Sequence, residues 1–224
     1  MDLYTNYAKE FSMTRTKPWA GWNKLIKYFK NNIKVLDVGC GNGRFLKFLA
    51  DHIEKFEYTG IDNSTDMLSI AKAKIQNWSK DKKYKPKLIL GNAENIDKIE
   101  EVNINKYNLI VAFGIMHHIL TFKYRIKLLK DLSNLLNKDG VLIITWWRFL
   151  AFKKYRKKII KKYKGKYNYV LSFGQKDAQR YCHYFTKLEV FNLLKNTIKT
   201  QITEYFLEDG FNNSENIYTI CIKE

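Results

Sequence analysis

The chain has few cysteines, few prolines and no long apolar run. Its three cysteines, Cys40, Cys182 and Cys221, are scattered through 224 residues and odd in number. They match neither a disulfide framework nor a zinc quartet, so we expect a reducing, cytoplasmic setting and no metal site. No apolar stretch approaches the length of a membrane span, and the first residues lack the apolar core of a signal peptide. The sequence therefore predicts neither a disulfide-rich secreted protein nor a membrane protein.

Acidic residues are scarce relative to basic ones. Lys and Arg number 40 against 22 Asp and Glu, which gives a net charge of +18. A charge of this size favours a polyanionic partner such as nucleic acid. A lysine-rich genome is the alternative source, but such a bias would raise glutamate together with lysine. Hydrophobic residues make up 46% of the chain, which is typical of a globular protein, and the length suits a single domain over residues 1–224.

Short apolar runs alternate with segments of helical spacing along most of the chain. This alternation predicts an α/β fold with a doubly wound, mostly parallel sheet. An antiparallel hairpin is expected around residues 208–216, and a lysine-rich insertion at 148–169. The predicted strands are 33–39, 56–62, 87–92, 107–113 and 141–147, and the predicted helices are 44–52, 67–78, 124–140 and 186–196.

A glycine-rich segment, LDVGCGNG at residues 36–43, lies where the first predicted strand turns into a helix. Ligands of open α/β sheets bind at the carboxyl ends of strands, and glycines let the backbone approach them closely. Asp37 stands before the loop, where its carboxylate would repel a pyrophosphate and attract the ammonium group of a methionine moiety. Asp62 ends the second strand, where it could accept hydrogen bonds from two ribose hydroxyls. The glycines, Gly39, Gly41 and Gly43, follow the spacing G-x-G-x-G and not the dinucleotide spacing G-x-G-x-x-G.

These residues resemble the cofactor site of class I S-adenosylmethionine-dependent methyltransferases, over roughly Ile33 to Ile144. The resemblance implies a seven-stranded Rossmann-like sheet and S-adenosylmethionine as the cofactor. GNAENI, at residues 91–96, takes the place of that family's adenine-binding turn. The family often has an acid where Asn92 stands, and an ordinary turn asparagine is the alternative interpretation. The cofactor residues that the resemblance implies are Asp37, Gly39, Gly41, Gly43, Asp62, Asn63, Asn92 and Ala93.

Three further segments mix aromatic, basic and histidine side chains: FSMTRTKPWAGW at 11–22, IMHHI at 115–119 and RYCHYF at 180–185. Together with Trp147 they resemble the tRNA methyltransferases that esterify 5-carboxymethyluridine at the wobble position. The resemblance runs from about Tyr4 to the final hairpin. It implies tRNA as the substrate. The eukaryotic members work with a small zinc-containing activator subunit, which is therefore a candidate partner.

The chemistry of such a reaction needs little acid–base help. A carboxylate with a pKa of about 4 is ionised at neutral pH, so its attack on the sulfonium methyl requires alignment and removal of water. RYCHYF is predicted to be a pocket wall, with Arg180 and His183 facing the methyl group and Phe185 in the core. His118 is interpreted as a packed histidine behind the site. The predicted catalytic residues are Arg15, His117, Arg180 and His183, and those predicted to stack on the uracil are Trp19, Trp147 and Tyr181.

The N-terminal segment and the lysine-rich insertion also have predicted roles, and two alternative functions remain open. Residues 1–32 are predicted to form a lid over substrate and cofactor. The insertion at 148–169 contains KKYRKKIIKKYKGK, which either contacts RNA or presents a solvated helix face. A small-molecule O-methyltransferase acting on a phenol, a quinone or a carboxylic acid remains open. So does a non-catalytic RNA-binding protein that retains the fold.

Overall fold

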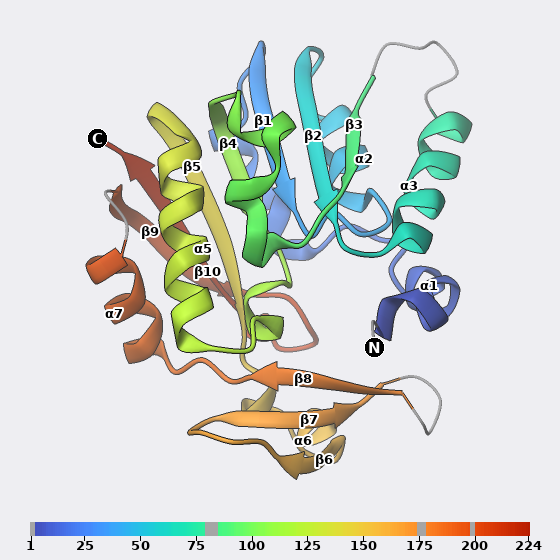
Figure 1. Ribbon diagram of the computed structural model, residues 1–224, viewed down its shortest axis with the longest axis vertical. Coiled ribbons are helices and arrows are strands. Elements are labelled where there is room, and N and C mark those ends of the chain that lie inside the picture. Colours follow the sequence, from blue (N-terminus) through green and yellow to red (C-terminus); the bar gives the residue numbers. More distant parts are fainter. Residues whose placement is uncertain (1–2, 79–84, 174–177, 198–199) are drawn as a thin grey trace.

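The computed structural model describes residues 3–78, 85–173, 178–197 and 200–224. Seven strands form one sheet: β1 Ile33–Val38, β2 Phe56–Asp62, β3 Lys87–Leu90, β4 Tyr107–Ala112, β5 Leu136–Trp147, β9 Thr200–Glu208 and β10 Asn216–Lys223. Their order is β3-β2-β1-β4-β5-β10-β9 (Figure 1). The first five are parallel, and β10 runs antiparallel to β5 and β9. This confirms the predicted doubly wound sheet with its C-terminal hairpin.

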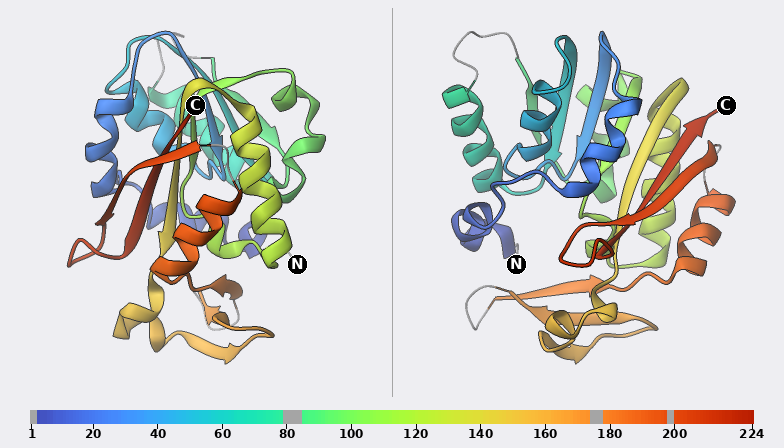
Figure 2. Two further views of the ribbon diagram at one scale, coloured as in Figure 1. Left: turned by 90° about the vertical axis from the view of Figure 1, so that its left-hand side faces the viewer. Right: turned by 180° about the vertical axis from the view of Figure 1, so that it is seen from behind.

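Helices cover both faces of this sheet (Figure 2). They are α2 Arg44–Ala50, α3 Thr65–Trp78, α4 Glu100–Asn103, α5 Phe122–Leu135 and α7 Lys187–Thr197, with the 3-10 helices η1 Ala20–Tyr28 and η2 Ala93–Lys98. Successive residues of a strand point to opposite faces. In β1, Val35 packs with η1 and α2, whereas Leu36 packs with α5 and α7. A continuous apolar run is what a strand buried on both faces requires.

One helix ends earlier than predicted. The sequence pattern extends it to Gly140, but α5 ends at Leu135 and β5 begins at the next residue. Asp139 has a φ of 59°, and a Cβ at Gly140 would lie 2.8 Å from the carbonyl oxygen of Asn137. Glycine is therefore required at this position because another part of the backbone comes close at the start of β5. It does not cap the helix.

A second, three-stranded antiparallel sheet lies below the carboxyl ends of the parallel strands in Figure 1. Its strands are β6 Ile159–Lys162, β7 Asn168–Ser172 and β8 Gln179–His183. The lysine-rich insertion supplies β6, the start of β7 and the short helix α6, Lys153–Arg156, so the helix-face interpretation is wrong for most of it. The small core that joins this sheet to the end of β5 contains Trp147, Phe149, Leu171 and Cys182.

The N-terminal segment reaches the same edge of the large sheet. Helix α1, Leu3–Met13, contacts α3 and lies near the carboxyl end of β2 (Figure 1). The chain then passes the glycine-rich loop and enters η1. In the ranges given above, no helix is both long enough and apolar enough to cross a bilayer.

Candidate functional site

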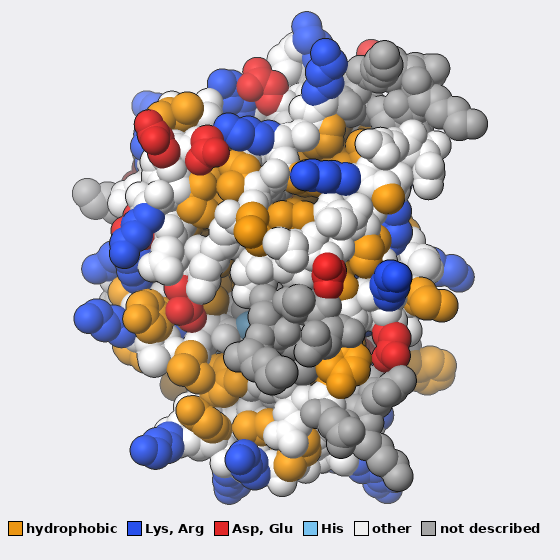
Figure 3. Space-filling view, turned by 45° about the vertical axis from the view of Figure 1, so that its right-hand side comes forward, with side chains coloured by type: hydrophobic (Ala, Val, Ile, Leu, Met, Phe, Trp, Pro, Cys, Tyr) orange, Lys and Arg blue, Asp and Glu red, His pale blue; other side chains and the backbone are white. Residues whose placement is uncertain are grey.

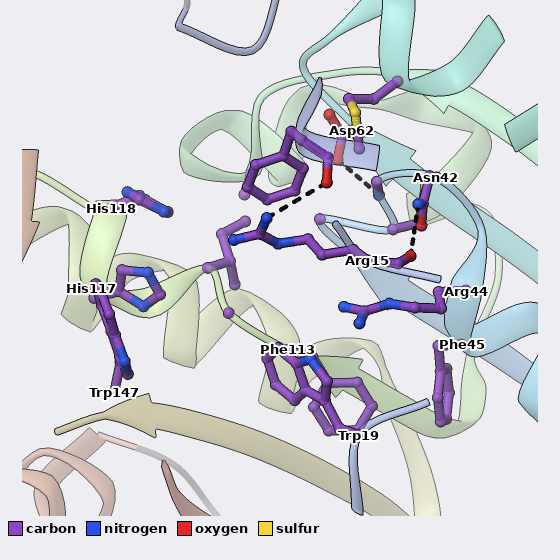
Figure 4. A pocket seen from close by; sticks show the side chains of 18 of the residues that line it. Arg15, Trp19, Asn42, Arg44, Phe45, Asp62, Phe113, His117, His118 and Trp147 are labelled. Carbon is purple, nitrogen blue, oxygen red and sulfur yellow. Dashed lines mark hydrogen bonds between the residues drawn. The ribbon is translucent and has the colours of Figure 1, made fainter. Parts of the chain in front are cut away.

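A cavity of about 910 Å³ opens between the N-terminal segment, the carboxyl ends of the parallel strands and the second sheet (Figure 4). The glycine-rich loop forms one part of its wall. The segments around Arg15, His117, Trp147 and Arg180 form another part. The cavity therefore joins the predicted cofactor residues to the predicted substrate residues.

The glycine-rich loop is held in a conformation that favours glycine. Gly39 and Gly41 have φ values of 79° and 54°, in the left-handed region that other residues rarely adopt. A Cβ at Gly41 would also lie 3.3 Å from the Cε of Met67. Gly43, with a φ of 74°, precedes the first turn of α2. The loop therefore turns the chain from β1 into α2 and keeps its backbone open to the cavity.

Asp62 ties this loop to the next strand–helix connection. Its carboxylate accepts hydrogen bonds from the amide of Gly41 at 2.8 Å and from the amide of Ser64 at 3.0 Å. A carboxylate can accept about four hydrogen bonds, so one that binds two amides can also accept from ligand hydroxyls. The Ser64 hydroxyl accepts from Met67 N at 3.3 Å near the start of α3, while Asn63 lines the cavity.

Asp37 is a buried carboxylate at the base of the cavity. Its side chain is 2% exposed and accepts a hydrogen bond from the Tyr58 hydroxyl at 2.6 Å. Burial raises the pKa of Asp37 to about 7, and the nearby Asp62 charge adds to the rise, while the Tyr58 hydrogen bond opposes it. A cationic ligand would favour the ionised form of this carboxyl.

The turn after β3 provides the side chain that caps the following 3-10 helix, η2. The Asn92 side-chain oxygen accepts from the amide of Glu94 at 2.9 Å, which caps η2. Asn92 and Ala93 nevertheless line the cavity. The hydrogen bond of Asn92 is therefore the one expected of an ordinary turn asparagine. Its role in cofactor binding stays a prediction.

Arg15 is held over the cavity from two sides. Its guanidinium carbon lies 3.5 Å from the centre of the Phe11 ring and 5.7 Å from that of Phe173. The amide of Asn42, in the glycine-rich loop, donates to the Ser12 hydroxyl at 2.9 Å. It also donates to the Arg15 carbonyl at 3.1 Å (Figure 4). Asn42 is buried and links the loop to the N-terminal segment, a role that its position within the loop did not reveal.

The tryptophans of the N-terminal segment pack differently. Both line the cavity, but Trp22 is 2% exposed and belongs to the core, whereas Trp19 is only partly buried. Trp19 packs against Trp22 and Phe113, with ring centres 5.7 and 6.1 Å apart. The predicted lid is also joined to the C-terminal hairpin, because the amide of Gly21 donates to Asp209 at 3.0 Å.

Strand β8 corrects the predicted pocket wall. Arg180 lines the cavity, with its guanidinium carbon 5.0 Å from the centre of the Trp147 ring and 4.9 Å from that of Phe173. Tyr181 and His183 do not line it. Residues an odd number apart in a strand point to opposite faces, so Arg180 and His183 cannot share one wall.

The other face of β8 carries a buried polar network instead. The Tyr181 hydroxyl accepts from Arg125 at 2.8 Å, and the His183 ring contacts Asn168 at 2.6 Å and Glu189 at 2.8 Å. These bonds attach the second sheet to α5 and α7. Phe185 is 1% exposed and packs on Trp146, which confirms its predicted place in the core.

Both histidines of the 3-10 helix η3, Met116–His118, line the cavity. His117 is 6% exposed, packs 5.0 Å from the Trp147 ring centre, and has an Nδ1 without a hydrogen-bond partner among the described residues. His118 Nδ1 donates to the Tyr181 carbonyl at 3.1 Å. Burial lowers the pKa of both rings, that of His118 to about 3, so both are neutral at physiological pH.

Sequence reasoning missed several residues of the cavity wall. Among them are Asn42, Phe173, Tyr155, Lys158, Asp209 and Glu215. Glu215 accepts a hydrogen bond from Tyr155 at 2.7 Å and pairs with Lys154, so the final hairpin also reaches the cavity. Asn42 lies within the glycine-rich motif and Asp209 and Glu215 in the predicted hairpin, but the residue pattern alone gave none of them a place in the cavity wall.

The residues present fit S-adenosylmethionine. Glycines with positive φ leave the loop backbone open, Asp37 offers a buried carboxylate that a cation would ionise, and Asp62 has acceptor capacity for ribose. Residues 36–142 match the sequence profile of a family described as a methyltransferase domain. Both the fold and the matched domain are similar to those of class I S-adenosylmethionine-dependent methyltransferases.

Comparison with solved structures supports the fold. An S-adenosylmethionine-dependent methyltransferase from Methanosarcina mazei superposes with a TM-score of 0.72 at 17% sequence identity. The match covers 92% of this chain and 98% of that protein. At this level of identity the likeness establishes the architecture alone.

Curated relatives include tRNA (carboxymethyluridine(34)-5-O)-methyltransferases. The protein of that name from Mus musculus is 26% identical over 146 residues, which are 65% of this chain and 19% of the mouse protein. The one from Saccharomyces cerevisiae is 23% identical over 145 residues, 65% of this chain and 46% of the yeast protein. The chain thus matches less than half the length of either relative.

Proposed function

We propose that this methyltransferase esterifies the carboxylate of 5-carboxymethyluridine at the wobble position of tRNA. The observation that carries the proposal is the meeting of Arg15 and Arg180 in one cavity. Both guanidinium groups lie near the ring of Phe173, although the two arginines come from opposite ends of the chain. The names of the curated relatives add support.

The charges of this half of the cavity suit an anion. His117 and His118 are neutral, so the arginines supply the positive charge that faces a carboxylate or a phosphate. Trp19 and Trp147 offer aromatic surfaces for a planar base. A bidentate grip on the carboxylate would occupy the lone pairs that must attack, so we expect an arginine to bind one oxygen only, or a neighbouring phosphate.

Catalysis by these residues would rest on alignment. The carboxylate is already ionised, and its oxygen displaces the methyl group from sulfur in line. The neutral leaving group requires no proton. Holding the oxygen and the methyl together and excluding water can supply up to about 7–11 kcal/mol. Arg15, Arg180 and His117 are the candidates for this positioning.

The second sheet offers a surface for the rest of a tRNA. Lysine and arginine side chains are spread over the face in Figure 3 and ring its lower edge, where this sheet lies. Exposed lysines of the insertion are Lys153, Lys154, Lys157, Lys158, Lys161, Lys162, Lys164 and Lys166. Lys158 also lines the cavity, so a tRNA backbone bound along this sheet would lead into the site.

A zinc-containing activator subunit is a further candidate partner. Strand β3 is the last strand on its side of the large sheet, and Leu90 at its end is 57% exposed. An exposed apolar residue on an unpaired edge favours pairing with another chain. Such a subunit would dock beside β3, next to the turn at Gly91 and Asn92 that lines the cavity.

The proposal is tested by incubating the protein with S-adenosylmethionine and tRNA that carries 5-carboxymethyluridine, followed by mass spectrometry of the nucleosides. We expect the acid to be converted to its methyl ester. Lys138→Ala, which removes an exposed basic side chain outside both the cavity and the insertion, serves as the control for Arg180→Ala. Methylation of a small phenol or acid with no change in the tRNA would instead support the small-molecule alternative. Cofactor binding without any transfer would support the non-catalytic one.

A further inference from the structure

We propose that His117, His118 and Cys182 form a binding site for a zinc-type divalent metal ion beside the main cavity. One ligand atom from each residue lies within 4.8 Å of the other two. His117 and Cys182 are 6% and 0% exposed. The histidines end η3, and the cysteine lies on the face of β8 that turns toward them. The proposal is independent of the tRNA substrate.

The hydrogen bonds around the histidines are those of a metal site. His118 Nδ1 donates to the Tyr181 carbonyl at 3.1 Å, so Nε2 carries the lone pair. Histidines that ligate metals commonly donate their other ring nitrogen to a carbonyl in this way, which fixes both tautomer and ring orientation. The Nδ1 of His117 is buried without a hydrogen-bond partner in the described part of the chain. A metal bound to this nitrogen would remove the free-energy cost of burying it without a partner.

The ligand types select a soft or borderline ion. Two imidazoles and a thiolate suit zinc or cobalt, whereas magnesium and calcium prefer oxygen ligands. A neutral imidazole binds a metal without losing a proton. The cysteine thiol would release its proton to solvent when the metal–sulfur bond forms. The nearby Arg180 guanidinium opposes a cation, and the thiolate charge offsets this repulsion.

The geometry leaves a fourth position open. His117 and His118 line the cavity, so an ion between them would have access to water or to a ligand oxygen there. With metal–nitrogen distances of about 2.0 Å and a metal–sulfur distance of about 2.3 Å, tetrahedral ligands lie roughly 3.3–3.7 Å apart. Because the three ligand atoms lie within 4.8 Å of one another, they would draw together by no more than about 1.5 Å on binding.

Cobalt titration of the full chain tests the site, because a cobalt–thiolate bond gives an intense near-ultraviolet charge-transfer band. We expect the band to saturate at one cobalt per chain, zinc to displace it, and Cys182→Ser to remove it. Cys221→Ser changes another buried cysteine, outside the cluster, and should keep it. A wild-type protein without the band, or the same band in Cys182→Ser, would overturn the proposal.

X-ray absorption at the cobalt edge provides a test that needs no variant. We expect one sulfur and at least two imidazole nitrogens in the coordination sphere of the wild-type complex. Coordination by nitrogen and oxygen alone would refute the site even if Cys182→Ser failed to fold.

Discussion

The two halves of the cavity are built in different ways. The cofactor half comes from one short stretch of chain, residues 37–43, and from Asp62 one strand later, and its geometry is set by backbone conformation. The substrate half is assembled from the N-terminal segment, η3, the end of β5 and the second sheet. A local motif can specify the first half, whereas the second exists only after distant segments have packed. Changes in the two halves should therefore have separable effects.

Removing Asp62 should give the largest effect. Asp62→Ala deletes the acceptor for Gly41 and Ser64 and the proposed acceptor for the cofactor's ribose. Removal of two hydrogen bonds to a charged group corresponds to roughly 3–6 kcal/mol, so we expect cofactor affinity to fall a hundredfold or more by calorimetry. Asp66→Ala, on the exposed first turn of α3, is the control. Near-normal affinity of the Asp62 variant would contradict the assignment of this half.

Removing Arg180 should affect the other half alone. Arg180→Ala should lower kcat/KM for tRNA by about 2–4 kcal/mol in transition-state stabilisation, in the range for loss of one preorganised charge-stabilising donor. Cofactor affinity should change little. Lys138→Ala, outside the cavity and the insertion, should leave both quantities unchanged. Equal losses of cofactor affinity and turnover would show that the two halves are not separable.

Asn42 connects the halves and should give a smaller, mixed effect. Asn42→Ala removes the hydrogen bonds to Ser12 and to the Arg15 carbonyl. At about 1 kcal/mol for each bond, we expect roughly a tenfold to thirtyfold loss in kcat/KM for tRNA. Cofactor affinity, measured in parallel, should fall by a factor several times smaller than the factor for kcat/KM. Ser12→Ala, which keeps the bond to Arg15, should lie between this variant and the wild type.

The pH dependence of cofactor binding should report on Asp37. Burial raises the pKa of Asp37 to about 7, so below that pH the free protein holds a neutral acid where a cation must bind. Affinity should weaken as pH falls below 7, approaching tenfold per unit. The same shift makes the contribution of Asp37 to free-protein stability decline as pH rises from about 4 to 7. Asp37→Asn should flatten the binding profile; a flat wild-type profile from pH 6 to 8 would contradict the role.

The smallest effect on chemistry is expected from the insertion. Changing Lys157, Lys158, Lys161 and Lys162 to Ala should weaken tRNA binding and reduce its salt dependence by roughly 0.7–0.9 log units for each phosphate that is no longer bound. Turnover at saturating tRNA should change little. The control replaces four exposed lysines on the large-sheet domain, Lys72, Lys98, Lys123 and Lys138. An unchanged salt dependence would make the insertion a solvated surface.

The fold was predictable because its signals are local. Apolar runs such as β1 are buried on both faces in any parallel sheet, and three glycines at alternate positions mark the turn into α2. The end of α5 was not predictable in the same way. The helical apolar pattern continues past Leu135, but the close backbone approach that makes Gly140 part of the following strand comes from the fold.

The sequence by itself determined the cofactor half of this protein and the presence of arginine and aromatic residues for a second half. Only the tertiary structure decided which face of β8 meets the cavity. It placed Arg180 inside and turned Tyr181 and His183 to α5 and α7, because a strand alternates its side chains. It also brought Cys182, isolated in the sequence, beside two histidines more than sixty residues earlier. Such encounters depend on how separate segments pack, and no local pattern of residues encodes them.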